Sequence, residues 1–220
     1  MEQAVSTPED LIVQLGNRLL AVQHAVAEIT GGRKVDADPQ ALADAVLQIR
    51  QIVNSIDGAY ACFIGGLAVQ QLGYLRWTDD VDVVVDQEHF SEVLSKLRES
   101  GFVLQPDYSL KSATTGARVD MLKEGVALHG SSHTLPHPRE LGKNTDYASF
   151  QALVFLKLCA GRMKDMADVV ELLKRRFPEA AAVGLQLPDQ FKPKFNDLVE
   201  QARKELNDIN PLSASFGNLA

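Results

Sequence analysis

The sequence predicts an α/β (α+β) fold, in which a mixed sheet occupies the middle of the chain and helices flank it on both sides. Three observations support this prediction. Apolar residues recur at helical spacing up to Gly58 and again from Ser149 onwards. Between these regions, short apolar, strand-like runs alternate with helical stretches. A turn-like spacer at 114–116 separates two of the runs, so a hairpin should add antiparallel strands to the sheet.

Two helices are expected before the sheet. Thr7 can cap the first one, with Pro8 in the first helical position. Asp38 and Pro39 begin the second helix in the same way, and its apolar face continues to Gly58.

The remaining elements are expected in a regular order. Strand-like runs are ACFI, VDVVV and FVLQ, and a hairpin should join 109–113 to 117–122. Further helices are expected over 88–100, 149–177 and 188–207.

This order divides the chain into four expected segments. They are an N-terminal helical segment (1–58), an α/β core (59–145), a C-terminal helical subdomain (146–209) and a flexible tail (210–220). The sequence has no linker rich in Pro, Gly and Ser between them, so one compact unit is as plausible as several domains.

Composition excludes some classes of function. The net charge is −7 and the basic residues are dispersed, which disfavours a large nucleic-acid surface but leaves room for a local basic pocket. No apolar run approaches the roughly 18 residues of a membrane helix, and the first residues lack a secretion signal. Cys62 and Cys159 have apolar neighbours, which is typical of buried thiols in a reducing compartment. We therefore expect a cytoplasmic protein without a membrane partner.

The most informative segment is RWTDDVDVVV at 76–85. If its Val-rich part is a strand, Asp80 and Asp82 point to one face and the intervening valines to the other. Two carboxylates about 4 Å apart repel by about 1 kcal/mol in water and more in a protein, so a cation between them is favoured. Magnesium, which binds carboxylates together with substrate phosphates, suits this pattern. A solvated strand end with turn-forming acids is the alternative.

Two neighbouring features favour a phosphate-transfer site. Gly65 and Gly66 stand between a strand and a short helix, where backbone N–H groups can approach an anion. Asp120 is an isolated acid in an apolar strand and offers a third ligand if that strand adjoins the first. The alternatives are a tight turn at the glycines and an edge-strand aspartate paired with Arg118 or Lys123.

Together, these segments resemble the nucleotidyltransferase superfamily that includes DNA polymerase β. More narrowly, the chain is similar to the abortive-infection and toxin-type nucleotidyltransferases of bacteria. The resemblance covers roughly residues 59 to 175, and the N-terminal helices are outside it. Its motifs are FIGGLA at 63–68, RWTDDVDVVV at 76–85, the h-D-h strand around residue 120, LKL at 156–158 and RMKDMAD at 162–168.

The resemblance implies a set of roles. Asp80 and Asp82 would bind two Mg²⁺ ions, Asp120 would be the third carboxylate and would assist the attacking hydroxyl, and Gly65 and Gly66 would cradle the triphosphate. The family often has Gly-Ser where this chain has Gly-Gly, so a side-chain hydroxyl that contacts the phosphates is missing here.

Basic and polar side chains complete the expected site. By the same resemblance Lys157 is a phosphate contact, and a lysine facing the cleft would neutralise triphosphate charge. Arg76 and Thr78 are expected to bind the nucleotide, to orient the carboxylates or to cap a turn. Lys164 and Asp168 fall near the Lys157 face of one long helix, with a solvated helix face as the alternative.

Two further features are less informative. His129, His133 and His137 recur every four residues, but glycine, serine and proline around them argue against a helix, so a polar rim is favoured over a zinc site. Trp77 is as compatible with packing as with stacking on a base.

The resulting hypothesis is a Mg²⁺-dependent, cytoplasmic enzyme that moves a nucleoside monophosphate from an NTP to an acceptor hydroxyl. The acceptor is tRNA or another RNA, a protein, or a small molecule such as an aminoglycoside. One version makes the chain the toxin of a toxin–antitoxin pair, with an antitoxin as partner. The alternative is a catalytically weak or inactive nucleotide-binding or partner subunit with the same fold.

Overall fold

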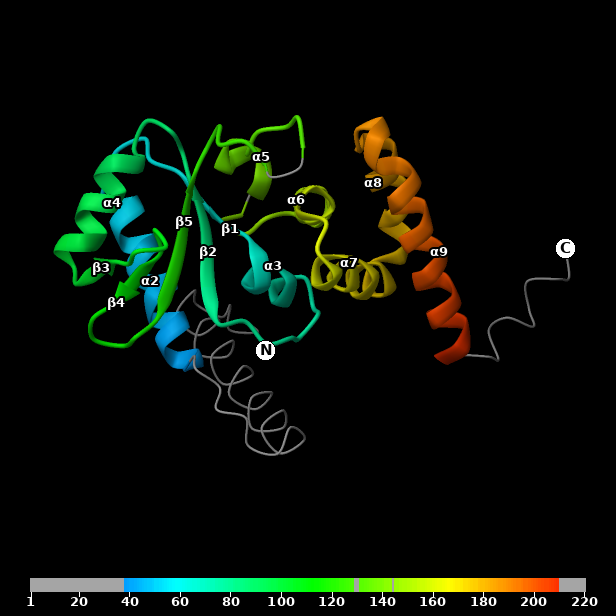
Figure 1. The fold of residues 1–220 in the computed structure, drawn as a ribbon, viewed down its shortest axis with the longest axis horizontal. Helices are drawn as coiled ribbons and strands as arrows, with labels where there is room; N and C mark the ends of the chain where they lie inside the picture. Colours follow the sequence, from blue (N-terminus) through cyan, green and yellow to red (C-terminus); the bar gives the residue numbers. More distant parts are fainter. Residues whose placement is uncertain (1–37, 129–130, 144, 210–220) are drawn as a thin grey trace, which may run out of the picture.

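The computed structural model describes residues 38–128, 131–143 and 145–209 (Figure 1). The helix expected after Thr7, the tail from residue 210 and His129 lie outside these residues. The described part is a mixed sheet with helices on both faces and a group of helices beyond one side of it, which confirms the expected α/β class.

The sheet has five strands in the described residues, in the order β1-β2-β5-β4-β3. β2 and β5 are parallel, and each of the other neighbouring pairs is antiparallel. The hairpin expected around residues 114–116 is present between β4 and β5. The strands are β1 (Ala61–Phe63), β2 (Asp80–Val85), β3 (Phe102–Leu104), β4 (Leu110–Ser112) and β5 (Arg118–Lys123).

Alternation along β2 gives the two faces of the sheet different chemistry. Val81, Val83 and Val85 are buried in the apolar cluster that also contains residues of α2 (Pro39–Asn54) and α4 (Phe90–Glu99). Val84 belongs to the other cluster, on the face covered by the later helices, and Asp80 and Asp82 share that face because they alternate with the valines. The expected division of the two acids from the valines is confirmed.

Helix α2 begins where the sequence predicts. The Asp38 side chain accepts a hydrogen bond of 2.9 Å from the Gln40 N–H, and Pro39 takes the first helical position. Leu42 and Ile49 lie on its buried face against the sheet. α2 thus covers the valine face of β2 and leaves the acid face to other elements.

The long helix expected over 149–177 is wrong, because Gly161 divides it. Gly161 has a φ of +66° and ends α6 (Phe150–Ala160) with an N–H bond to the Lys157 carbonyl. The chain then turns into α7 (Met163–Arg175). The following elements are a 3₁₀ turn (Phe177–Glu179), α8 (Ala180–Gln186), a second 3₁₀ turn (Asp189–Phe191) and α9 (Lys192–Ile209).

Two short helices complete the fold near the sheet. α3 (Gly65–Gln71) follows β1 directly and α5 (Pro138–Gly142) packs against β1. Backbone hydrogen bonds from Phe63 N–H to Asp146 O (2.7 Å) and from Ala148 N–H to Phe63 O (2.9 Å) join the chain before α6 to β1. The four-segment division of the chain stays a prediction.

Cys62 and Cys159 are both buried free thiols, as expected from their apolar neighbours. Among the described helices, none combines the length and the apolar character that crossing a membrane requires.

Candidate active site

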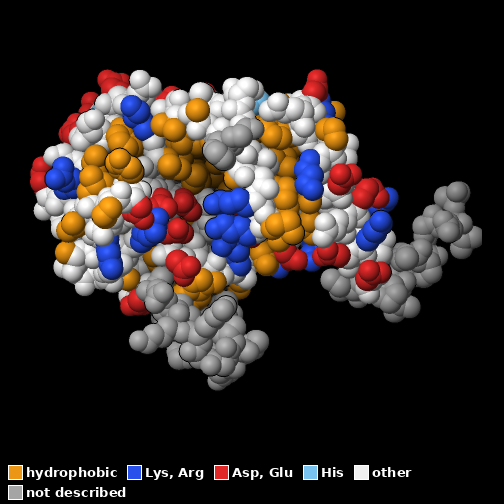
Figure 2. All heavy atoms as spheres, in the orientation of Figure 1, with side chains coloured by type: hydrophobic (Ala, Val, Ile, Leu, Met, Phe, Trp, Pro, Cys, Tyr) orange, Lys and Arg blue, Asp and Glu red, His pale blue; other side chains and the backbone are white. Residues whose placement is uncertain are grey.

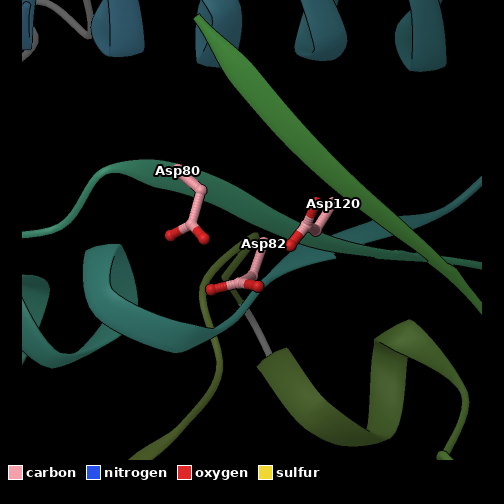
Figure 3. Close-up of side chains that lie close together, drawn as sticks. All are labelled: Asp80, Asp82 and Asp120. Carbon is pink, nitrogen blue, oxygen red and sulfur yellow. The ribbon is translucent and has the colours of Figure 1, made fainter. Parts of the chain in front are cut away.

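Three carboxylates converge on the acid face of the sheet. β2 and β5 run parallel in a register that places Asp82 opposite Asp120, and Asp80 stands two residues earlier on the same face. One oxygen of each of the three side chains lies within 4.8 Å of the others (Figure 3). All three are partly buried, so the cluster is open to a ligand on one side. The sequence-based expectation that Asp120 adjoins the pair is confirmed.

The cluster carries more negative charge than its surroundings balance. Burial, followed by the charges of Asp80 and Asp120, raises the pKa of Asp82 to about 6, while Lys157 and Lys164 act in the opposite direction. The ionised form is therefore disfavoured despite two nearby lysines. An all-oxygen donor set with this repulsion suits a hard divalent cation, which would replace the repulsion with attraction.

Asp120 also has a basic neighbour, Arg118, which stands opposite Asp80 in the pairing of β2 with β5. Arg118 Nε lies 3.2 Å from Asp120 Oδ1, and Arg118 also contacts Asp107 at 3.3 Å. The predicted alternative of a pair with Arg118 is thus present, but β5 lies between β2 and β4 and is not an edge strand. Because half of the Arg118 side chain is exposed, this pair leaves Asp120 free to contact a ligand.

The two glycines are required by close contacts. Gly65 has a φ of +62°, and a Cβ atom there would lie 1.8 Å from Asp82 Oδ2. A Cβ atom on Gly66 would lie 2.2 Å from Thr78 Oγ1. Gly65 therefore allows the loop to pass directly beside the carboxylate, and Gly66 allows Thr78 to approach.

Thr78 occupies the space that a side chain at position 66 would need. Its Oγ1 lies 2.2 Å and its Cβ 2.5 Å from the position of a Cβ on residue 66. Thr78 is buried, and its hydroxyl lies 3.2 Å from Asp80 Oδ1, to which it donates. The Thr78 hydroxyl thus lies beside Gly66, two residues before β2.

Lys157 lies in a buried cluster of ion pairs beside the triad. Its Nζ is 3.2 Å from Asp165 Oδ1 and 2.5 Å from Asp168 Oδ2. The exposed fractions of Lys157, Asp165 and Asp168 are 5%, 2% and 3%. The alternative of a solvated helix face is therefore wrong for these residues, and the Lys164–Asp168 pair that it included is absent from the described residues.

The break at Gly161 explains this arrangement. Because α6 and α7 are separate helices, Lys157 faces Asp168 across the turn instead of sharing a helix face with it. On a single helix, the eleven positions from Lys157 to Asp168 would span about three turns, and the two side chains could not meet.

Arg76 connects this cluster to the loop before β2. Its Nε lies 2.9 Å from Asp168 Oδ1, but the alignment is too poor for a hydrogen bond, so the contact is an ion pair. Its Nη1 donates to the Trp77 carbonyl at 2.6 Å. Trp77 in turn donates from its indole N–H to Asp79. Arg76 therefore lies between the glycine turn and the buried lysine.

A basic surface faces the triad from the start of α7. Arg162 Nε pairs with Asp165 at 2.6 Å, and the pKa of Arg162 is raised first by this hydrogen bond and further by Asp82 and Asp80. Lys164 is exposed and lowers the pKa of Asp82. Figure 2 shows Lys and Arg side chains gathered beside the acidic side chains near the middle of this face.

Sequence reasoning did not select Arg162 as a site residue. The feature that could have identified Arg162 is its position directly after Gly161, the glycine that ends α6 and turns the chain into α7. Because residues 157, 164 and 168 were interpreted as lying on one helix, this turn was not predicted.

His133 and His137 do not join the triad of Asp80, Asp82 and Asp120. His137 caps α5 by accepting from the Arg139 N–H at 3.1 Å, and His133 packs on Phe155 and Phe191. Within the described residues, the triad is the one group of three or more His, Cys, Asp or Glu that could hold a metal ion.

Comparisons with known proteins give matches in structure. No protein-family model and no curated protein matches the sequence. The chain is similar to ANT(2″)-Ia, solved in complex with adenylyl-2″-tobramycin, at 15% identity and a TM-score of 0.44, covering 76% of this chain and 98% of that one. It is also similar to an antigenic nucleotidyltransferase-like protein from Paracoccidioides brasiliensis, at 15% identity and a TM-score of 0.37, covering 81% and 92%. Because the identities are 15% and the TM-scores are below 0.5, the functional conclusion rests on the residues of the site and not on these similarities.

Proposed function

We propose that this chain is a Mg²⁺-dependent nucleotidyltransferase that moves a nucleoside monophosphate from an NTP to an acceptor hydroxyl. The observation that carries the proposal is the convergence of three aspartates from two parallel strands, opposite the basic start of α7. In a metal-bound triphosphate, the metal ions would bind to the carboxylates and the phosphates would bind to the cations.

Asp80, Asp82 and Asp120 would hold two Mg²⁺ ions, which would supply positive charge to the triphosphate. Their donor set consists of oxygens alone, which suits this hard cation. Asp120 would accept the proton of the acceptor hydroxyl, whose oxygen forms the new bond to the α-phosphorus as the bond to pyrophosphate breaks. Thr78 would keep Asp80 oriented through its hydrogen bond.

The glycine turn and the basic surface would bind the phosphates. Backbone N–H groups at Gly65 and Gly66, in the first turn of α3, would bind the phosphates, and the Thr78 hydroxyl beside Gly66 would stand in for the missing serine. Arg162 and Lys164 would make direct phosphate contacts from α7. Lys157 would contribute mainly through its charge, because its ammonium is held by two buried aspartates. Arg76, which lies next to Gly66 and pairs with Asp168, would orient the glycine turn.

The direct test is transfer of label from α-labelled NTPs in the presence of Mg²⁺ and a mixture of RNA, protein or small hydroxyl compounds. We expect transfer by the wild type and its loss in Asp82→Asn and Asp120→Asn. Asp79→Asn is the matched control, because this exposed neighbour lies outside the triad. Tight NTP binding without transfer to any acceptor would instead favour the nucleotide-binding subunit.

We propose, further, that the acceptor decides whether the chain acts as a toxin. Labelled tRNA would favour a toxin with an antitoxin partner, and labelled aminoglycoside would favour small-molecule modification. Induced expression should arrest growth in the first case, and Asp82→Ala should relieve the arrest. Unchanged growth on expression of the wild type would argue against the toxin.

A further inference from the structure

A cavity lies at the β1 edge of the sheet, and none of the three triad residues lines it. Its volume is about 610 Å³, within the range of small-molecule sites. Its lining residues come from α2, edge strand β1, α5 and the segment that follows α5. Its walls include Ile49, Val53 and Phe63, which belong to the apolar cluster on the valine face of β2. The cavity therefore lies at the β1 edge of the sheet, and none of the residues of the proposed active site lines it.

The charged residues that line this cavity are mainly cationic. Arg50, Arg139 and Lys143 line it together with one carboxylate, Asp146. Arg50 pairs with Asp146 through Nε. This local excess of positive charge contrasts with the net charge of −7 for the whole chain.

Aromatic rings hold the two guanidinium groups in place. The Arg139 guanidinium carbon lies 3.6 Å from the centre of the Tyr60 ring. The Arg50 guanidinium carbon lies 5.5 Å from the centre of the Phe63 ring and 5.3 Å from that of Tyr147. Such stacking leaves the N–H edges of a guanidinium available to an anion and lowers the entropy cost of binding one.

Two of the three cations have no carboxylate partner among the described residues. Within residues 38–128, 131–143 and 145–209, no ion pair involves Arg139 or Lys143, and Lys143 Nζ donates to the neutral Gln151 Oε1 at 3.2 Å. Both residues are exposed at the mouth of the cavity and stand four positions apart across the end of α5. An anion placed there would meet two unneutralised charges next to an apolar wall.

We propose that this cavity binds a small organic anion, with a phosphate or carboxylate head group at Arg139 and Lys143 and an apolar or aromatic body against Ile49, Val53 and Phe63. Arg50 adds a third donor group behind the head group. The proposal does not depend on the nucleotidyltransferase function, because it uses none of the triad or phosphate-binding residues.

Calorimetric titration with phenyl phosphate and with benzoate, in EDTA, tests the proposal on the full chain. We expect saturable binding of at least one probe, and the tighter probe identifies the head group. Arg139→Ala/Lys143→Ala should weaken binding about tenfold or more. Asn54→Trp should also weaken it, because it fills the cavity at the exposed end of α2 without removing a charge.

The matched control is Arg203→Ala/Lys204→Ala, which removes two exposed cations from α9, outside the cavity lining and outside the proposed active site. Binding unchanged by this control supports the cavity as the site. A loss of binding in the control, unchanged binding in Arg139→Ala/Lys143→Ala or in Asn54→Trp, or no binding of either probe up to about 10 mM would overturn the proposal.

Discussion

Two groups of buried or partly buried aspartates lie side by side in this protein and have opposite electrostatics. In the triad, burial and the neighbouring carboxylates raise the pKa of Asp82 to about 6. In the cluster between α6 and α7, burial would also raise the pKa of Asp165, but Arg162 and Lys157 outweigh it and the pKa is lowered. The charges of the α6–α7 cluster are balanced within the protein, whereas those of the triad are not. This difference indicates that the α6–α7 cluster supports the fold and that the triad is suited to a cationic ligand.

The largest expected effect concerns activity at the triad. Asp82→Asn keeps the shape of the side chain but removes one charged ligand, so label transfer should fall at least about a thousandfold. Initial rates under saturating NTP and Mg²⁺ measure the loss. Asp79→Asn should stay within about threefold of the wild type, and a similar loss in both variants would remove the distinction between the triad and its neighbour.

The next effect concerns stability at the α6–α7 cluster. Lys157→Ala leaves two buried carboxylates with less compensating charge, so the free energy of unfolding should fall by about 3 kcal/mol. Urea denaturation measures it. Lys164→Ala, at an exposed position close by in sequence, should change the free energy by less than about 0.5 kcal/mol. Equal stability of the two variants would contradict a structural role for the buried cluster.

Magnesium should stabilise the protein through the triad. At a Mg²⁺ concentration about 100 times its Kd, the free energy of unfolding should rise by about 2.7 kcal/mol. The same addition should leave Asp82→Asn/Asp120→Asn almost unchanged. Thermal denaturation with and without Mg²⁺ measures both, and an equal response in the double variant would place the metal elsewhere.

Without metal, the triad should cost stability at neutral pH. The folded pKa of Asp82 is above its ordinary value of 3.8, so stability is greatest below that value and is lost as the pH rises through about 6. In EDTA at pH 7, Asp82→Asn should therefore be more stable than the wild type by about 1–2 kcal/mol. At pH 4 the difference should nearly vanish. Urea titrations at both pH values check the sign, and a less stable variant at pH 7 would contradict the repulsion.

The smallest expected effect concerns the hydroxyl that replaces the family serine. Thr78→Ala should lower label transfer about tenfold, through the loss of the hydroxyl beside Gly66. Gly66→Ser alone should destabilise the protein, since its Cβ would overlap Thr78. The double variant Gly66→Ser/Thr78→Gly also removes the Thr78 Cβ, which lies 2.5 Å from the position of a Cβ on residue 66, so the serine has room and activity should partly return. A double variant no better than Thr78→Ala would show that the two hydroxyls are not equivalent.

Local patterns predicted much of the fold. The cap at Asp38 and the alternation along β2 each depend on a few neighbouring residues, and both are present. The single helix over 149–177 was wrong because apolar periodicity continues across Gly161, whereas the positive φ at that glycine ends the helix. Periodicity indicates a helix but does not show where a glycine ends it.

The site was predictable only in part for the same reason. Asp80 and Asp82 share a face by alternation alone, but the approach of Asp120 depends on the pairing of β2 with β5, which the resemblance suggested and periodicity could not. The buried pairs of Lys157 and the position of Arg162 depend on the turn at Gly161, so their contacts could not be derived from spacing along one helix.

The most direct test of the central claim is a crystal structure with Mg²⁺ and a non-hydrolysable NTP. The account predicts metal density bridging Asp80, Asp82 and Asp120, with the phosphates between Gly65 and Arg162. Density for the nucleotide at another place, or metal bound without any of the three carboxylates, would contradict it.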